Sequence, residues 1–381
     1  MFRSKISFVV PNVIVAMLML SVATTGSAQA AQEEARHLVS RSEANLRSAV
    51  SGLRDEVEIV IERHGEGDSI KEVRTVDRLV VLPNLLVTAE VESGEKPTVV
   101  FEMLVRDGQS FNAASSDEAD NIDNLSYSKN PEMVALVRDT ALYNAQNGGF
   151  LHGGIWAGEL NENMSVFDLV RQGSSLTVRG DESIAGVKCR HLIAETSVGR
   201  LELWIAPELD ALLMKYRLTQ LKPGEVMEKF AVQMEATDFE SGDGRSYVTE
   251  ARYKESADWV NPDWKPIEGD MVARRNDVEF EAFTAGSDDR LVLTHLKDGA
   301  PALTTDRDVD YTIPMAWKDG EIVVADSTEA LDYSEDAVNA RLAARAGATT
   351  DGGWTTPVLI SLAVGCAAVA GFIFYRRSTA A

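Results

Sequence analysis

Apolar and polar residues alternate with a period of two along much of this chain, the pattern of strands with one buried face. In the first such run, Val57, Ile59 and Ile61 alternate with Glu58 and Glu62. Further strands are expected at 99–105, 110–113, 201–205, 212–218, 230–235, 278–283, 291–294 and 322–324. This order predicts a meander of antiparallel strands with one apolar face.

Helical spacing interrupts the strands at three places. Residues 32–53 carry apolar side chains near every third or fourth position, which predicts an amphipathic helix. Asn130 and Pro131 are typical of a helix start, and we expect this helix to end at Gly148-Gly149. Ser165 precedes Asp168 by three positions, the spacing of a capping box. These last two helices could lie over an open sheet.

The two ends of the chain resemble targeting segments. Arg3 and Lys5 precede a short apolar run and small residues ending at Ala30, which predicts a signal peptide over residues 1–30. Residues 357–375 carry no charge and are followed by Arg376 and Arg377, which predicts a membrane helix with a cytoplasmic basic end. We therefore expect a single-pass protein of the cell envelope, periplasmic or surface-exposed. Whether a sorting enzyme removes the C-terminal helix stays open.

The charge balance narrows the class of partner. The formal net charge is −23, and loss of the first thirty residues removes two positive charges and no negative ones. So acidic a chain repels phosphate backbones, which argues against nucleic-acid binding. One of the two cysteines, Cys366, falls in the predicted membrane helix, so we expect no internal disulfide in the exported part.

Motifs of catalysis or metal binding are scarce. Nucleophile-elbow, phosphate-loop and zinc-protease motifs are absent from the sequence. Cys189 and His191 share a strand face, but a zinc site needs two more ligands, and a buried thiol beside a partly exposed imidazole is the favoured interpretation. The glycine-rich stretch 148–154 is interpreted as a flexible hinge, and the acidic residues of 117–123 as a solvated loop. We expect no metal, no cofactor and no enzyme activity.

Residues 180–239 resemble a known family. Gly180, Gly186, Cys189 and His191 are followed by a Leu-Trp-Ile run ending at Ile205 and by further strands. This series is similar to an uncharacterised family of predicted periplasmic proteins, itself similar to the LolA/LolB-like lipoprotein carriers. The resemblance covers roughly residues 35–240.

The resemblance implies a mainly β, α+β fold, an open and incomplete antiparallel β-barrel with a helical lid. Its apolar concave face would shelter lipid or lipoprotein acyl chains, and each buried methylene contributes roughly 0.8 kcal/mol. The expected cavity residues are Val99, Phe101, Met103, Leu201, Leu203, Leu212, Met214, Phe230, Val232 and Met234. The expected lid residues are Met133, Val137, Phe167 and Leu169.

These expectations divide the chain into five parts. They are the signal peptide (1–30), the half-barrel domain (31–240), an additional β-rich region that could complete the sheet (241–330), a helical stalk and linker (331–353), and a membrane anchor (354–377). The leading hypothesis is a membrane-anchored binding protein for acyl chains. An envelope sensor or interaction domain without a small ligand is the alternative, and a hydrolase with a carboxylate-based site is a third.

Overall fold

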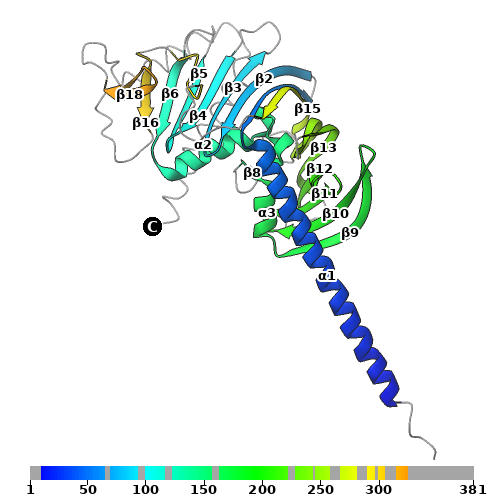
Figure 1. The fold of residues 1–381 in the computed structure, drawn as a ribbon. Coiled ribbons are helices and arrows are strands. Elements are labelled where there is room, and N and C mark those ends of the chain that lie inside the picture. The colour runs from blue at the N-terminus through cyan, green and yellow to red at the C-terminus, as the bar shows by residue number, and fades with distance from the viewer. Residues whose placement is uncertain are drawn as a thin grey trace, which may run out of the picture.

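A single long sheet dominates the computed structural model and curves into an arch (Figure 1). The structure describes residues 10–64, 69–92, 99–115, 122–156, 163–221, 228–242, 245–257, 267–280, 290–296, 299–304 and 315–324. Within them the sheet has sixteen strands and is open, with β9 (Ser175–Ile184) at one end and β18 (Glu321–Val324) at the other. The expected mainly β, open architecture is therefore confirmed.

The first half of the sheet is a meander of six strands in chain order. They are β1 (Leu53–His64), β2 (Ser69–Val81), β3 (Asn84–Glu92), β4 (Val99–Arg106), β5 (Gln109–Ser115) and β6 (Ile122–Ser128). Three short strands extend it beyond β6, namely β16 (Pro301–Thr304), β17 (Met315–Lys318) and β18. The pairing of β16 with β6 is parallel, unlike the antiparallel pairing of its neighbours.

The second half is another meander that returns to the first. It runs from β9 through β10 (Val187–Thr196), β11 (Gly199–Ala206), β12 (Leu212–Leu221), β13 (Glu228–Gly242) and β14 (Arg245–Ala257) to β15 (Ile267–Phe280). The last strand, β15, pairs antiparallel with β1 and so joins the two halves. Residues beyond 240 thus supply strands at the centre of the sheet.

Helices gather on the concave side of the arch (Figure 1). The long α1 (Val10–Val50) contacts β9, β11, β12 and β14 through its C-terminal part. The chain between β6 and β9 forms what we call the helical lid, residues 131–156 and 163–172. It comprises α2 (Pro131–Tyr143), η1 (Ala145–Asn147), η2 (Gly149–His152), the small β7 (Gly154–Trp156) and β8 (Asn163–Ser165) pair, and α3 (Val166–Gln172).

Both predicted helix starts in the lid are confirmed. The Asn130 side chain accepts a hydrogen bond from the backbone N–H of Glu132 at 2.9 Å, and Pro131 is the first helical residue. Ser165 and Asp168 form a reciprocal capping box at the start of α3. Such caps satisfy amide groups that the first helical turn leaves without partners.

Three predicted elements differ in the structure: two helices have other ends, and one strand is not formed. The helix α1 begins at Val10, well before residue 32, and ends at Val50, because Gly52 adopts a left-handed conformation with φ 77°. The helix α2 ends at Tyr143 and not at the glycine pair. The predicted strand at 291–294 is not a strand, because backbone amides of Thr294 and His295 donate to the side chain of buried Glu102.

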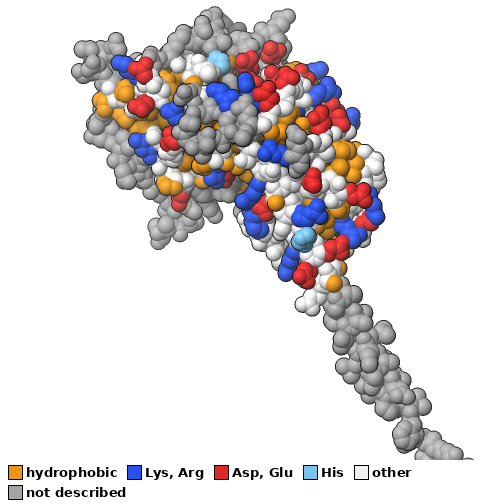
Figure 2. All heavy atoms as spheres, in the orientation of Figure 1, with side chains coloured by type: hydrophobic (Ala, Val, Ile, Leu, Met, Phe, Trp, Pro, Cys, Tyr) orange, Lys and Arg blue, Asp and Glu red, His pale blue; other side chains and the backbone are white. Residues whose placement is uncertain are grey.

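Side chains pack into two hydrophobic clusters on opposite faces. The larger one lies between the concave face and the helices and includes Val76 and Val80 of β2. The smaller one includes Leu79 of the same strand together with Leu291 and Trp317, so the first meander is buried on both faces. The visible surface mixes acidic and basic side chains with small apolar areas between them (Figure 2).

Of the two predicted targeting segments, the structure describes only part of the N-terminal one. The helix α1 passes without interruption through the predicted cleavage site after Ala30. Among the residues that the structure describes, no helix is both long and apolar enough to cross a membrane. The predicted stalk (331–353) and anchor (354–377) lie outside the described residues.

Candidate functional site

The concave face of the second meander is apolar and completely covered. Leu201, Leu203, Met214, Val232 and Met234 are at most 1 % exposed, and Leu212 is 6 % exposed. Two lid residues expected to cover them, Phe167 and Leu169, are also fully buried in the same cluster. Packing against the lid and α1 therefore fills this part of the arch.

The other candidate residues lie further along the sheet or the lid. Phe101 and Met103 on β4 are partly buried against the large cluster, as is Val137 on α2. Met133 is half-buried on α2. The strands β4 and β13 contain Val99 and Phe230, whose side chains lie outside the described set.

The stretch 148–154, interpreted from the sequence as a flexible hinge, is a packed part of the lid. Residues 149–152 form a buried 3-10 turn, and a side-chain carbon on Gly149 would lie 2.4 Å from the backbone of Tyr143. The glycine is thus required because two backbone segments approach closely here. Phe150 of this turn stacks on Tyr253 of β14 with ring centroids 5.0 Å apart.

Buried polar side chains of the sheet bind backbone carbonyls of the lid. The Tyr216 hydroxyl donates to the carbonyl oxygen of Gly154. A guanidinium nitrogen of Arg78 lies 3.4 Å from the carbonyl oxygen of Asn147, and Arg275 Nη2 lies 3.4 Å from that of Leu151. These contacts hold the lid against the sheet at a small number of points.

A charged cluster lies beneath the turn at 147–152. Arg78 Nε donates to Asp55 Oδ1 at 2.8 Å, and Arg78 Nη2 contacts the other carboxylate oxygen. Arg275 Nε lies 3.5 Å from Asp55 Oδ2, and Arg275 Nη2 lies 2.8 Å from Nδ1 of His152. The side chains of Asp55, Arg78 and Arg275 are 0 % exposed.

The cluster carries an excess of positive charge. Burial, followed by the charges of Arg78 and Arg275, holds the pKa of His152 well below its usual value, so this imidazole is neutral and accepts from Arg275. Burial lowers the pKa of Arg275 to about 10, which leaves it charged at neutral pH. Two guanidinium groups therefore face a single carboxylate in a medium where unbalanced charge is costly.

The sheet splits beside this cluster. Pairing between β14 and β15 ends at Glu250 and Arg274. Beyond that point residues 245–248 pair with β13, while Arg275, Asn276, Glu279 and Phe280 pair with β1. We call this gap the strand fork, residues 245–249 and 275–280. Tyr247 and Phe280 meet edge to face across it with centroids 5.1 Å apart.

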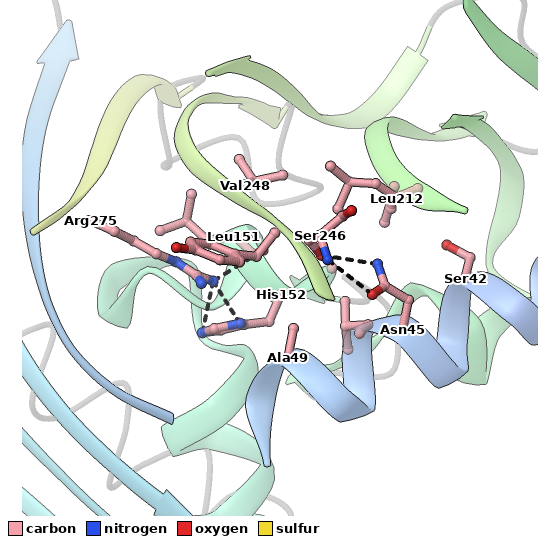
Figure 3. A pocket seen from close by; sticks show the side chains of 13 residues that line it. Ser42, Asn45, Ala49, Leu151, His152, Leu212, Ser246, Val248 and Arg275 are labelled. Carbon is pink, nitrogen blue, oxygen red and sulfur yellow. Dashed lines mark hydrogen bonds between the residues drawn. The ribbon is translucent and has the colours of Figure 1, made fainter. Parts of the chain in front are cut away.

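Arg275 lines two pockets at the strand fork. The helix-side pocket lies between α1, η2 and β14 and has a volume of about 20 Å³, room for about one water molecule (Figure 3). The fork pocket, of about 230 Å³, is lined by residues of β13, β14 and β15, including Asp238, Glu240 and Asp277. Two polar atoms here are buried and have no hydrogen-bond partner. They are Arg275 Nη1 and, in the helix-side pocket, Ser42 Oγ.

Cys189 and His191 are occupied by the protein itself. Burial raises the pKa of the Cys189 thiol to about 11, so a metal ion would have to displace its proton at neutral pH. His191 is buried, not partly exposed, and its two ring nitrogens lie 2.9 Å from a Glu182 oxygen and 2.8 Å from a Glu202 oxygen. The ring stacks on Trp204 at 4.2 Å. Within the described residues, no group of acidic, histidine and cysteine side chains is arranged to hold a metal.

The acidic loop lies mostly outside the described residues. Residues 116–121 are not described, and Asp123 is in β6 with its side chain outside the described set.

Sequence reasoning missed the charged cluster, although a signal was present. Asp55 continues the buried alternation of Val57, Ile59 and Ile61, and Arg78 stands between Val76 and Val80. A charged residue in phase with an apolar strand face points into the core, where it needs a partner. Applied to each strand, this test would have identified both residues.

Comparison with known proteins gives a partial family match. Residues 163–237 match the model of a family described as "Predicted periplasmic protein (DUF2092)". The resemblance inferred for residues 180–239 is thereby confirmed. No curated protein matches the chain.

Several solved structures are similar at low identity. A DUF1329 family protein from Desulfovibrio piger is 10 % identical with a TM-score of 0.38, over 66 % of this chain and 95 % of that one. A putative outer membrane lipoprotein-sorting protein domain from Vibrio parahaemolyticus is 9 % identical with a TM-score of 0.35, over 69 % and 96 %. LprF from Mycobacterium bovis is 11 % identical with a TM-score of 0.25, over 67 % and 97 %.

Proposed function

We propose that this protein binds lipid or lipoprotein acyl chains outside the cytoplasm, on the concave face of its sheet beneath the helical lid. The observation that carries the proposal is the apolar face of β11–β13, which a separate chain segment covers and a few polar contacts hold closed. The family description of residues 163–237 supports the extracytoplasmic location.

The lid has to move for acyl chains to enter. The concave side chains of β11–β13 and the lid residues Phe167 and Leu169 are buried in one cluster, so a chain of methylene groups fits only where lid side chains are displaced. Phe167 and Leu169 are the lid residues whose place an acyl chain would take. When an acyl chain replaces lid side chains on the sheet, one apolar surface is exchanged for another, which costs little hydrophobic free energy. The free-energy cost of opening the lid therefore comes mainly from its polar contacts with the sheet.

Anchoring by residues 354–377 belongs to the same proposal. An anchored binding protein would present its ligand at a membrane surface and would not carry it between membranes. The ten cavity residues and four lid residues inferred from the sequence remain the proposed ligand contacts.

The test is native mass spectrometry of the full-length chain purified from a membrane fraction in a nonionic maltoside detergent. We expect co-purifying acyl lipids, and after their removal we expect saturable binding of a fluorescent fatty acid. An empty chain that binds no fatty acid would overturn the proposal.

The filled interior also supports the alternative of an envelope interaction domain without a small ligand. A chain that stays empty in both measurements and forms a stoichiometric complex with one envelope protein would establish that function. The two candidates therefore give opposite results in the same preparation.

A further inference from the structure

Arg275 has an unused hydrogen-bond donor at the strand fork. Its Nη1 atom is buried and without a partner, Nε has no hydrogen bond and only the 3.5 Å ion-pair contact with Asp55, and Nη2 is used by His152 and Leu151. The side chain is 0 % exposed and lines both pockets. A buried guanidinium nitrogen without an acceptor is costly, which points to an acceptor supplied from outside the chain.

The charge of the cluster indicates what kind of acceptor fits. Both oxygens of Asp55 are engaged by Arg78, and Arg275 reaches only one of them, at the longer distance of 3.5 Å. His152 is neutral and adds no negative charge. An anionic oxygen on Arg275 would balance the excess charge and complete its hydrogen bonds.

The rim of the fork pocket is negatively charged, whereas the charged cluster beside it has an excess of positive charge. Asp238, Glu240 and Asp277 are exposed there, and Glu250 is half-buried. The other cation of the pocket, Arg274, lies 2.6 Å from Glu250 and is paired with it. A purely anionic ligand would meet these carboxylates on its way to Arg275, whereas a ligand with a cationic outer end would be attracted by them.

We propose that the strand fork binds a zwitterionic head group of the phosphoethanolamine type, with the phosphate on Arg275 and the ammonium group at the Asp238, Glu240 and Asp277 rim. This inference rests on the proposed function, since it assigns the polar end of a ligand whose acyl chains lie beneath the lid. The fork pocket, at about 230 Å³, is the larger of the two pockets and accommodates more than a single water molecule. Arg275 offers the phosphate a charge-assisted donor at Nη1, and an ammonium group keeps more of its hydration at an open rim.

The experiment uses the full-length chain in maltoside detergent with two kinds of probe. Phosphatidylethanolamine and phosphatidylglycerol with identical acyl chains are compared by native mass spectrometry. Glycerophosphoethanolamine and glycerophosphoglycerol, which lack acyl chains, are titrated by ligand-observed NMR. The variant is Arg275→Gln, and the matched control is Arg200→Gln, which removes the same charge from an exposed site on β11.

We expect the unmodified chain and Arg200→Gln to prefer the ethanolamine form of both probes by about tenfold, the effect of one charge-assisted hydrogen bond from the ammonium group to the acidic rim. Arg275→Gln should weaken binding of both head-group forms by about tenfold, because the phosphate that they share loses its donor. Asp238→Asn with Glu240→Gln should retain phosphate binding and bind the glycerol forms more tightly than the unmodified chain does.

The head-group site and acyl-chain binding can fail separately, and each failure gives a different experimental result. Lipids that bind without head-group preference, or glycerophosphoethanolamine binding that Arg275→Gln leaves unchanged, would overturn the head-group site and leave acyl-chain binding standing. In that case Nη1 would bind water only. Arg275-dependent binding of glycerophosphoethanolamine without any lipid binding would support the site and overturn acyl-chain binding. Binding of no probe would overturn both.

Discussion

Arg78 and Asp55 face each other on neighbouring strands, with Arg78 Nε 2.8 Å from Asp55 Oδ1 and both side chains 0 % exposed. The pair joins β1 to β2 directly beneath the lid, and Arg78 also reaches the carbonyl oxygens of Asn147 and Gly148. One ion pair therefore connects the central strands of the sheet to the segment that covers them.

Asp55→Asn should destabilise the protein by roughly 3–5 kcal/mol, because it leaves two buried guanidinium groups without a counter-charge. The free energy of unfolding, measured by denaturant titration, checks this. The exposed neighbour Arg54→Gln should change it by less than about 0.5 kcal/mol.

The contrasting variant is Arg275→Gln, which leaves Asp55 and Arg78 as a balanced pair. Its unfolding free energy should stay within about 1 kcal/mol of that of the unmodified chain. A loss as large as that of Asp55→Asn would show that the contacts of Arg275 with Asp55, His152 and Leu151 stabilise the fold more than its buried charge costs.

Acid should destabilise the protein through His152. Its pKa is lowered in the folded state, so below the ordinary value of about 6.5 the unfolded chain binds a proton that the folded chain does not. This contribution to stability is complete above that pH and falls by up to about 1.4 kcal/mol per pH unit below it.

The measurement is the unfolding free energy between pH 7.5 and 5. His152→Gln should flatten the profile in this range, whereas His37→Gln, at an exposed position on α1, should leave its slope unchanged. Equal slopes in all three proteins would contradict the assignment to His152.

Tyr216→Phe should ease lid opening. The substitution removes the hydroxyl that donates to Gly154 and keeps the ring, so closure loses roughly 1 kcal/mol and apparent fatty-acid affinity rises about fivefold. Tyr253→Phe is the matched control, because that ring packs on Phe150 and its hydroxyl has no hydrogen-bond partner. Equal affinities in the two variants would show that this contact does not restrain the lid.

Glu102→Gln should loosen the segment at 290–296. Glu102 is fully buried and accepts from the backbone amides of Thr294 and His295, and an amide side chain replaces a strong anionic acceptor with a weaker one. Hydrogen exchange at these two amides should accelerate about tenfold or more, while Glu90→Gln at an exposed position on β3 should have no effect there. Unchanged exchange would assign the anchoring to the apolar contacts of Leu291 and Leu293.

The sequence determined most of the local structure. Period-two alternation located β1, β4, β11, β12 and β13, since a strand with one buried face must alternate. Asn130 and Ser165 set the starts of α2 and α3, because their side chains satisfy amides within a few residues. Each of these features depends on neighbours close in the chain.

Only the tertiary structure decided what lies at the centre of the sheet. The pairing of β15 with β1 brings Arg275 next to Asp55, although the two residues are far apart in the sequence. No local sequence pattern encodes the register of that pairing. The divergence of β14 from β15 then opens the strand fork beside them. The sequence shows that Asp55 and Arg78 are buried, because each lies in register with the apolar positions of its strand. Which charged groups meet in the cluster, how far their charges balance and which pocket they face depend on long-range strand pairing.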